Sequence, residues 1–136
     1  MLESIVIGIL TGLVTGVLSG YYSGLVVSRT SRFNALIRDA KRALKNIEYM
    51  QEGHRAKIWG FERHAMNRAA DDLAADKQVK ASVTVRSQLY VMIREIDRAE
   101  RGEIDVGEFE KLIETARSVV SSLRAHPRVF KPWGAP

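Results

Sequence analysis

An uncharged run of 24 residues, from Ser4 to Val27, lies close to the first residue of the chain. As a helix it would be about 36 Å long, enough to cross a hydrocarbon core of about 30 Å with modest tilt. A secretory signal is disfavoured because the run is too long, no basic residue precedes it and no A-x-A-like site follows it. The run therefore predicts one transmembrane helix over residues 1–28.

The charged residues are distributed unevenly along the 136-residue chain, and all 21 basic residues lie at Arg29 or later. By the positive-inside rule this predicts a single-pass protein of the cell inner (plasma) membrane, with its N-terminus outside and its C-terminal part in the cytoplasm. The basic residues nearest the run are candidates for topology signals and for contact with anionic lipids, two compatible roles. They are Arg29, Arg32, Arg38, Lys41, Arg42 and Lys45.

Within the uncharged run, small residues recur every four positions. Four residues turn a helix by about 400°, so such a row drifts by about 40° per step, as in right-handed crossings near −40°. Small side chains let two helix backbones approach closely, which drives helix association in lipid. The rows predict a packing interface, with another copy of the chain or with a different protein's helix. They are formed by Gly8, Gly12, Gly16, Gly20 and Gly24, and by Thr11, Thr15, Ser19 and Ser23.

This four-residue pattern resembles the glycine-zipper helices of oligomeric membrane proteins, which include some mechanosensitive channels and pore-forming peptides. The resemblance covers residues 4–28 and implies homo-oligomerisation through helix packing, without implying a particular activity. The hydroxyl row is the wettable face that a pore would need, but the span contains no ionisable residue to mark an ion path. We therefore favour an anchored scaffold or adaptor, and a membrane-perturbing or pore-forming effector is the alternative.

The rest of the chain has the apolar spacing of amphipathic helices. One helix is expected to end near residue 53, and it can continue the membrane helix directly. Three further helices are expected over residues 57–76, 79–100 and 106–125. The expected fold class is all-α: one N-terminal transmembrane helix followed by cytosolic helices in a bundle or a coiled-coil-like assembly. Its parts are the membrane helix (1–28), a basic juxtamembrane helix (29–53), a cytosolic helical region (54–125) and a tail (126–136).

The tail contains all three prolines and is expected to be extended and irregular. Such a segment either lies frayed on its own domain or acts as a short linear motif. In the second case Phe130 and Trp133 would insert into a partner's groove. A protein partner could therefore bind through the tail or through the cytosolic helices.

Residues 97–109, DRAERGEIDVGEF, resemble the calcium loop of EF-hand proteins. Asp97, Asp105 and Glu108 occupy its first, ninth and twelfth positions, and Gly102 its sixth. The third and fifth positions carry alanine and arginine in place of oxygen ligands. Two helices joined by a turn explain the same residues without a metal. Gly102 would end the first helix, and Asp105 would begin the second.

The segment 95–114 carries eight acidic and three basic residues. Its net charge is therefore negative, opposite in sign to that of the basic group after the membrane helix. The two segments could attract each other, within one chain or between neighbours in an oligomer, and salt would weaken that attraction. A solvated charged face is the alternative explanation.

Catalytic signatures are absent from the sequence. His54, His64 and His126 share no helical turn, and no HExxH, nucleophile elbow, Walker loop or GxGxxG occurs. The chain also has no cysteine, which excludes disulfides, thiolate metal sites and a cysteine nucleophile. We expect neither an enzyme nor a cofactor, and nucleic-acid binding is disfavoured because membrane topology already explains the basic residues.

Overall fold

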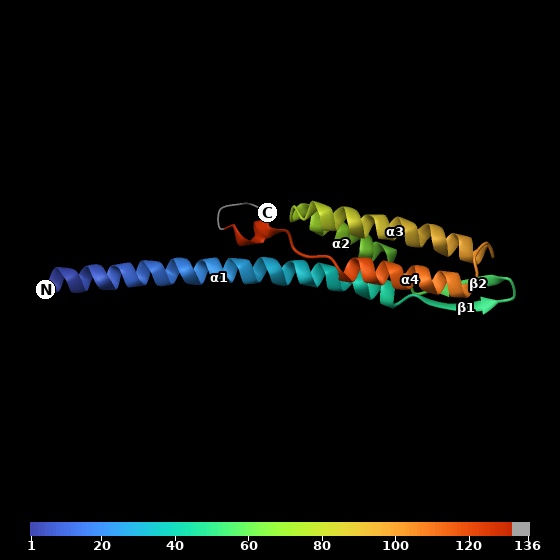
Figure 1. Cartoon of the computed structure of the whole chain (residues 1–136), viewed down its shortest axis with the longest axis horizontal. Coiled ribbons are helices and arrows are strands. Elements are labelled where there is room, and N and C mark those ends of the chain that lie inside the picture. The colour runs from blue at the N-terminus through green and yellow to red at the C-terminus, as the bar shows by residue number, and fades with distance from the viewer. Residues whose placement is uncertain (132–136) are drawn as a thin grey trace.

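A computed structural model of the chain, which describes residues 1–131, is mostly helical (Figure 1). The expected predominance of helices is thus confirmed. Successive helices alternate in direction, and a two-stranded antiparallel hairpin joins the first helix to the second. The elements are α1 (Leu2–Lys45), β1 (Glu48–Glu52), β2 (Arg55–Trp59), α2 (Arg63–Ala75), α3 (Val79–Glu100), α4 (Val106–Ser121) and a short 3-10 helix, η1 (Pro127–Phe130).

The first helix, α1, is unbroken over 44 residues and is therefore about 66 Å long. Its N-terminal half projects away from the rest of the molecule, whereas its C-terminal half packs against the other helices (Figure 1). The expected continuity between the apolar run and the following amphipathic helix is confirmed. We call residues 2–28 the stalk, and the C-terminal part of α1 together with α2, α3 and α4 the bundle.

The bundle forms around apolar side chains that recur every three or four residues on each helix. On α1 the buried face begins at Phe33 and continues through Ile37 and Leu44. The largest side chains that are less than 2% exposed come from all four helices: Leu44, Met66, Leu73, Val85, Met92, Phe109, Ile113 and Val120. A shared core of this kind holds the four helices together as one unit.

The hairpin contradicts two of the expected helix boundaries. The helix expected to reach residue 53 ends at Lys45, and the helix expected from residue 57 begins at Arg63. Glu52 pairs with Arg55, which leaves Gly53 and His54 as a two-residue turn with Gly53 at a φ of 67°. Glycine in the first position of such a turn is typical of type II′ hairpins, whose twist matches that of the strands.

The hairpin lies at the end of the bundle that is remote from the N-terminus (Figure 1). Tyr49 of β1 packs edge-to-face on Phe109 of α4, with ring centroids 5.5 Å apart. Across the strands, Nε1 of Trp59 donates a hydrogen bond of 2.7 Å to Oε2 of Glu48. The hairpin thus covers the far end of the core, opposite the stalk.

Candidate functional site

The stalk is apolar, and no other described element packs against most of its length. All residues from 1 to 24 are exposed, and large apolar side chains such as Leu2, Ile9 and Val17 are 64–80% exposed. Within residues 1–131, α1 is the helix whose length and composition suit a membrane crossing. Exposed apolar surface of this extent is typical of sites that contact a membrane or another protein.

The nine residues of the expected packing interface all lie on the exposed stalk. Among residues 1–131, a Cβ atom added to any of Gly8, Gly12, Gly16, Gly20 or Gly24 would meet nothing within 4 Å. Thr11, Thr15, Ser19 and Ser23 are exposed beside them. The row of small residues is therefore accessible to a second helix, and no part of the bundle fills it.

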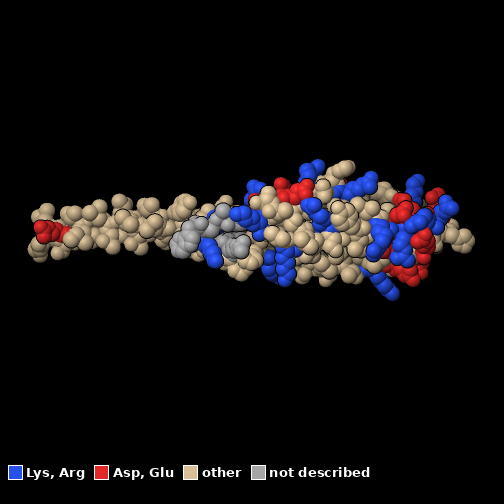
Figure 2. Space-filling model, turned by 90° about the horizontal axis from the view of Figure 1, so that it is seen from above, with Lys and Arg blue, Asp and Glu red and all other residues tan. Residues whose placement is uncertain are grey.

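The basic group after the stalk does not form one patch. Because α1 continues as a helix, Arg29 and Lys45 are about 24 Å apart along its axis. Arg29 and Arg32 lie beside the stalk, whereas Arg38, Lys41, Arg42 and Lys45 project from the exposed side of the packed part of α1. Figure 2 shows Lys and Arg side chains over the bundle but not on the outer part of the stalk. Of the six basic candidates, the first two thus lie nearest the apolar stalk.

Two connections bring distant segments to the junction between stalk and bundle, which we call the base of the bundle. The side chain of Arg32 forms an ion pair with Asp76, in the turn between α2 and α3. The hydrogen bond with Asp76 and its negative charge raise the pKa of the Arg32 guanidinium. The base also presents cations from the α2–α3 turn, Lys77, and from the first turn of α3, Lys80.

The C-terminal segment returns to the base and to the adjoining end of the stalk. The expected extended conformation is wrong for Pro127–Phe130, which form η1. The hydroxyl of Tyr22 donates a hydrogen bond to the backbone oxygen of Phe130, and Nη1 of Arg29 donates one of 2.7 Å to that of Lys131. The side chain of Phe130 remains 56% exposed, so it is available for contact with a partner or a lipid. Trp133 lies outside the described residues.

The loop that resembles an EF-hand is held by helix caps. Gly102 adopts a φ of 76°, and hydrogen bonds run from its amide to the oxygen of Ala99 and from the Glu103 amide to the oxygen of Arg98. These two bonds define a Schellman C-cap for α3. Asp105 accepts a 2.7 Å hydrogen bond from the backbone amide of Glu108, which makes it the N-cap of α4. The expected capping roles of Gly102 and Asp105 are confirmed.

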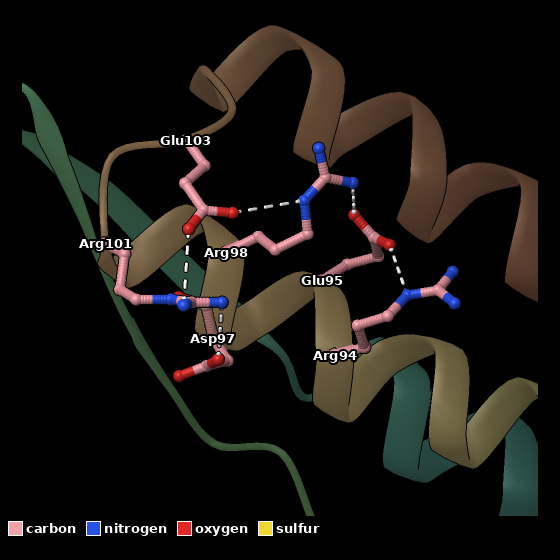
Figure 3. Close-up of polar contacts among 6 residues, drawn as sticks. All are labelled: Arg94, Glu95, Asp97, Arg98, Arg101 and Glu103. Atoms are coloured by element: carbon pink, nitrogen blue, oxygen red, sulfur yellow. Dashed lines mark hydrogen bonds and ion pairs between the residues drawn. The ribbon is translucent and has the colours of Figure 1, made fainter.

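The acidic side chains around this loop pair with nearby arginines (Figure 3). Glu95 is 2% exposed and accepts hydrogen bonds of 2.9 Å from Arg94 and Arg98. Asp97 pairs with Arg101 at 2.9 Å, and Glu103 lies 3.3 and 3.5 Å from Arg101 and Arg98. The acidic segment is thus partly neutralised locally, whereas Arg32 of the basic group pairs with Asp76, outside that segment.

Among residues 1–131, no three His, Asp or Glu side chains gather in a way that could hold a metal ion. Comparisons of the chain with protein-family models, with curated proteins and with solved structures find no match. The features suited to interaction are the accessible stalk and the cations at the base of the bundle. The sequence interpretation identified the first but missed Asp76, Lys77 and Lys80, because they are far from Arg29 in the sequence and meet it only in the fold.

Proposed function

We propose that this protein is a single-span protein of the cell inner (plasma) membrane, with its N-terminus outside and its bundle in the cytoplasm. The observation that carries the proposal is the exposed apolar stalk. It is helical throughout, carries no charge between Ser4 and Val27, and ends directly before Arg29 and Arg32. Lipid would cover its apolar surface, and the arginines would hold the bundle on the cytoplasmic side.

We further propose that the protein forms homo-oligomers through the glycine row and acts as an anchored scaffold or adaptor. The accessible glycines support this, because within residues 1–131 nothing occupies the groove that they form. A second protein would bind on the cytosolic helices or on the tail. The outer face of α3 offers Val79, Val83 and Tyr90, each 62% exposed, beside a groove of about 740 Å³.

The proposal is tested with purified full-length protein. In neutral detergent or nanodiscs, we expect the protein part of each particle to have two or more times the chain's mass of 15.3 kDa. In liposomes, an anchored scaffold leaves the bilayer tight to an encapsulated dye. Dye leakage would instead favour the membrane-perturbing effector, for which the exposed row of Thr11, Thr15, Ser19 and Ser23 would supply the polar face. A monomeric protein that stays in solution without detergent or lipid would refute both functions.

The orientation depends on the two arginines at the base. We expect the double substitution Arg29→Glu and Arg32→Glu to invert a substantial fraction of the molecules, because it replaces the cations closest to the span with anions. Protease accessibility of the bundle in oriented membrane vesicles measures the inverted fraction. The matched control changes Arg55 and Lys57 to Glu, which alters the charge equally in the remote hairpin. Equal accessibility in the wild type and both variants would contradict the proposed topology.

A further inference from the structure

A pocket of about 800 Å³ opens at the base of the bundle, between the α2–α3 turn and the segment that follows α4. Its apolar lining includes Val79, Leu123 and Pro127, and its cations are Lys77, Lys80 and Arg124. The two walls are joined by Gln78, whose buried side chain accepts a 2.8 Å hydrogen bond from the backbone amide of His126. The pocket is therefore part of the folded bundle.

The cations of this pocket are available to an anion. Within residues 1–131, neither Lys77 nor Lys80 forms an ion pair, and Arg124 donates only to the backbone oxygens of Ser121 and Leu123. The adjacent carboxylate, Asp76, is already paired with Arg32. An anionic group that entered the pocket would gain contacts with ammonium and guanidinium groups without displacing an existing ion pair.

The position of the pocket follows from the pair between Asp76 and Arg32. Arg32 lies five residues after Val27, so the α2–α3 turn lies about 8 Å beyond the uncharged run. The headgroup layer on each side of a bilayer is about 5–8 Å thick. If the stalk spans the membrane, as in the proposed function on which this inference rests, the pocket is at the level of the lipid phosphates.

We propose that this pocket binds an anionic phospholipid from the cytoplasmic leaflet of the membrane that the stalk crosses. Lys77, Lys80 and Arg124 contact its phosphate, and the apolar lining receives the adjoining glycerol and the upper part of an acyl chain. The volume suits part of one lipid molecule, since ligand pockets generally measure about 300–1,000 Å³. Basic pockets between membrane helices on the cytoplasmic side bind anionic lipid headgroups.

The binding experiment is a calorimetric titration of a short-chain phosphatidylglycerol into the full-length protein in neutral detergent. The test variant combines Lys77→Gly with Lys80→Gln. Because each cation near anionic lipid contributes about 1 kcal/mol, we expect about 30-fold weaker binding. The control variant combines Arg55→Gln with Lys57→Gln, which removes two cations from the remote hairpin and should bind as the wild type does.

A variant at Lys77 also separates a loss of binding from a loss of folding. Lys77 has a φ of 55°, a left-handed conformation that glycine adopts without strain. Lys77→Gly alone is therefore expected to leave the unfolding temperature unchanged or higher while weakening lipid binding about fivefold. Weaker binding in a variant of at least equal stability reports the lost charge and not unfolding.

Three outcomes would overturn the inference. They are wild-type affinity in the test variant, an equal loss in the control variant, and binding of phosphatidylcholine or inorganic phosphate as tight as that of phosphatidylglycerol. Flotation of the protein with liposomes tests the membrane anchor separately. A protein that floats but shows no preference in the titration loses only the lipid pocket, whereas a protein that does not float loses the proposed function.

Discussion

The substitution Gly16→Leu is expected to convert the oligomer into monomers without preventing membrane insertion. Gly16 is the middle member of the glycine row, and a leucine there fills the groove that a neighbouring helix backbone would enter. Insertion should persist because leucine is more apolar than glycine. Among the described residues, a Cβ at this position meets nothing within 4 Å, so we expect the substitution to leave the chain's own fold intact. Sedimentation of the full-length protein in neutral detergent measures the change in mass.

A matched control is available on the opposite side of the same helix turn. Val14 lies two residues before Gly16, which is about 200° around the helix axis, and it is also exposed. Val14→Leu adds apolar bulk at the same depth but away from the row, so the oligomer should keep its mass. If the Gly16 variant keeps the wild-type mass, or if both variants dissociate equally, the glycine row is not the interface.

The parts of the fold that could be predicted are those specified by local sequence. The helix expected over residues 79–100 coincides with α3, and α4 begins at Val106 as expected. In both helices the apolar stripe has a clear helical period, and Gly102 and Asp105 provide an end and a start through backbone geometry and capping. The helix over the apolar run could also be predicted, because the length and uniform composition of the run indicate a helix without any tertiary contact.

The hairpin was missed although its turn carries a local signal. Phe33, Ile37, Leu44 and Ile47 have helical spacing, and the helix predicted from it ends near residue 53, where glycine is a common helix terminator. A glycine in a two-residue turn, flanked by Tyr49 and Ile58, is also a hairpin signal. Packing of the hairpin on Phe109 stabilises the second possibility, and this long-range contact is not visible in a local pattern.

The basic pocket could not be predicted from local sequence, because its residues are distant along the chain. Lys77 and Arg124 are 47 positions apart, and each belongs to a short connection without a distinctive motif. They meet only because α2 and α4 both return toward the stalk, which places their C-terminal ends side by side. The charge of the chain predicts an affinity for anionic lipid, but only the topology of the bundle concentrates that charge in a pocket.

The second large expected effect concerns the junction between the hairpin and α1. Gly60 has a φ of 79°, and a Cβ there would lie 2.2 Å from the backbone oxygen of Asn46, the C-cap of α1. Gly60→Ala therefore requires the two backbone segments to separate, in addition to the cost of a left-handed alanine. We expect a loss of at least about 3 kcal/mol in the free energy of unfolding. The free energy of unfolding of most domains is only about 5–15 kcal/mol, so the variant would lose a large share of its stability.

Gly53→Ala separates the two contributions, because Gly53 has a φ of 67° but open space around its Cβ position. It should lose only about 1–2 kcal/mol, the cost of the left-handed conformation. Urea unfolding in detergent measures both losses through the fluorescence of Trp59, in a Trp133→Phe background. A larger loss for Gly60→Ala means that contact with Asn46 fixes where the hairpin leaves α1, and hence how α2 meets the core. Equal losses would mean that the backbone yields at this junction and that the core alone positions the bundle on the stalk.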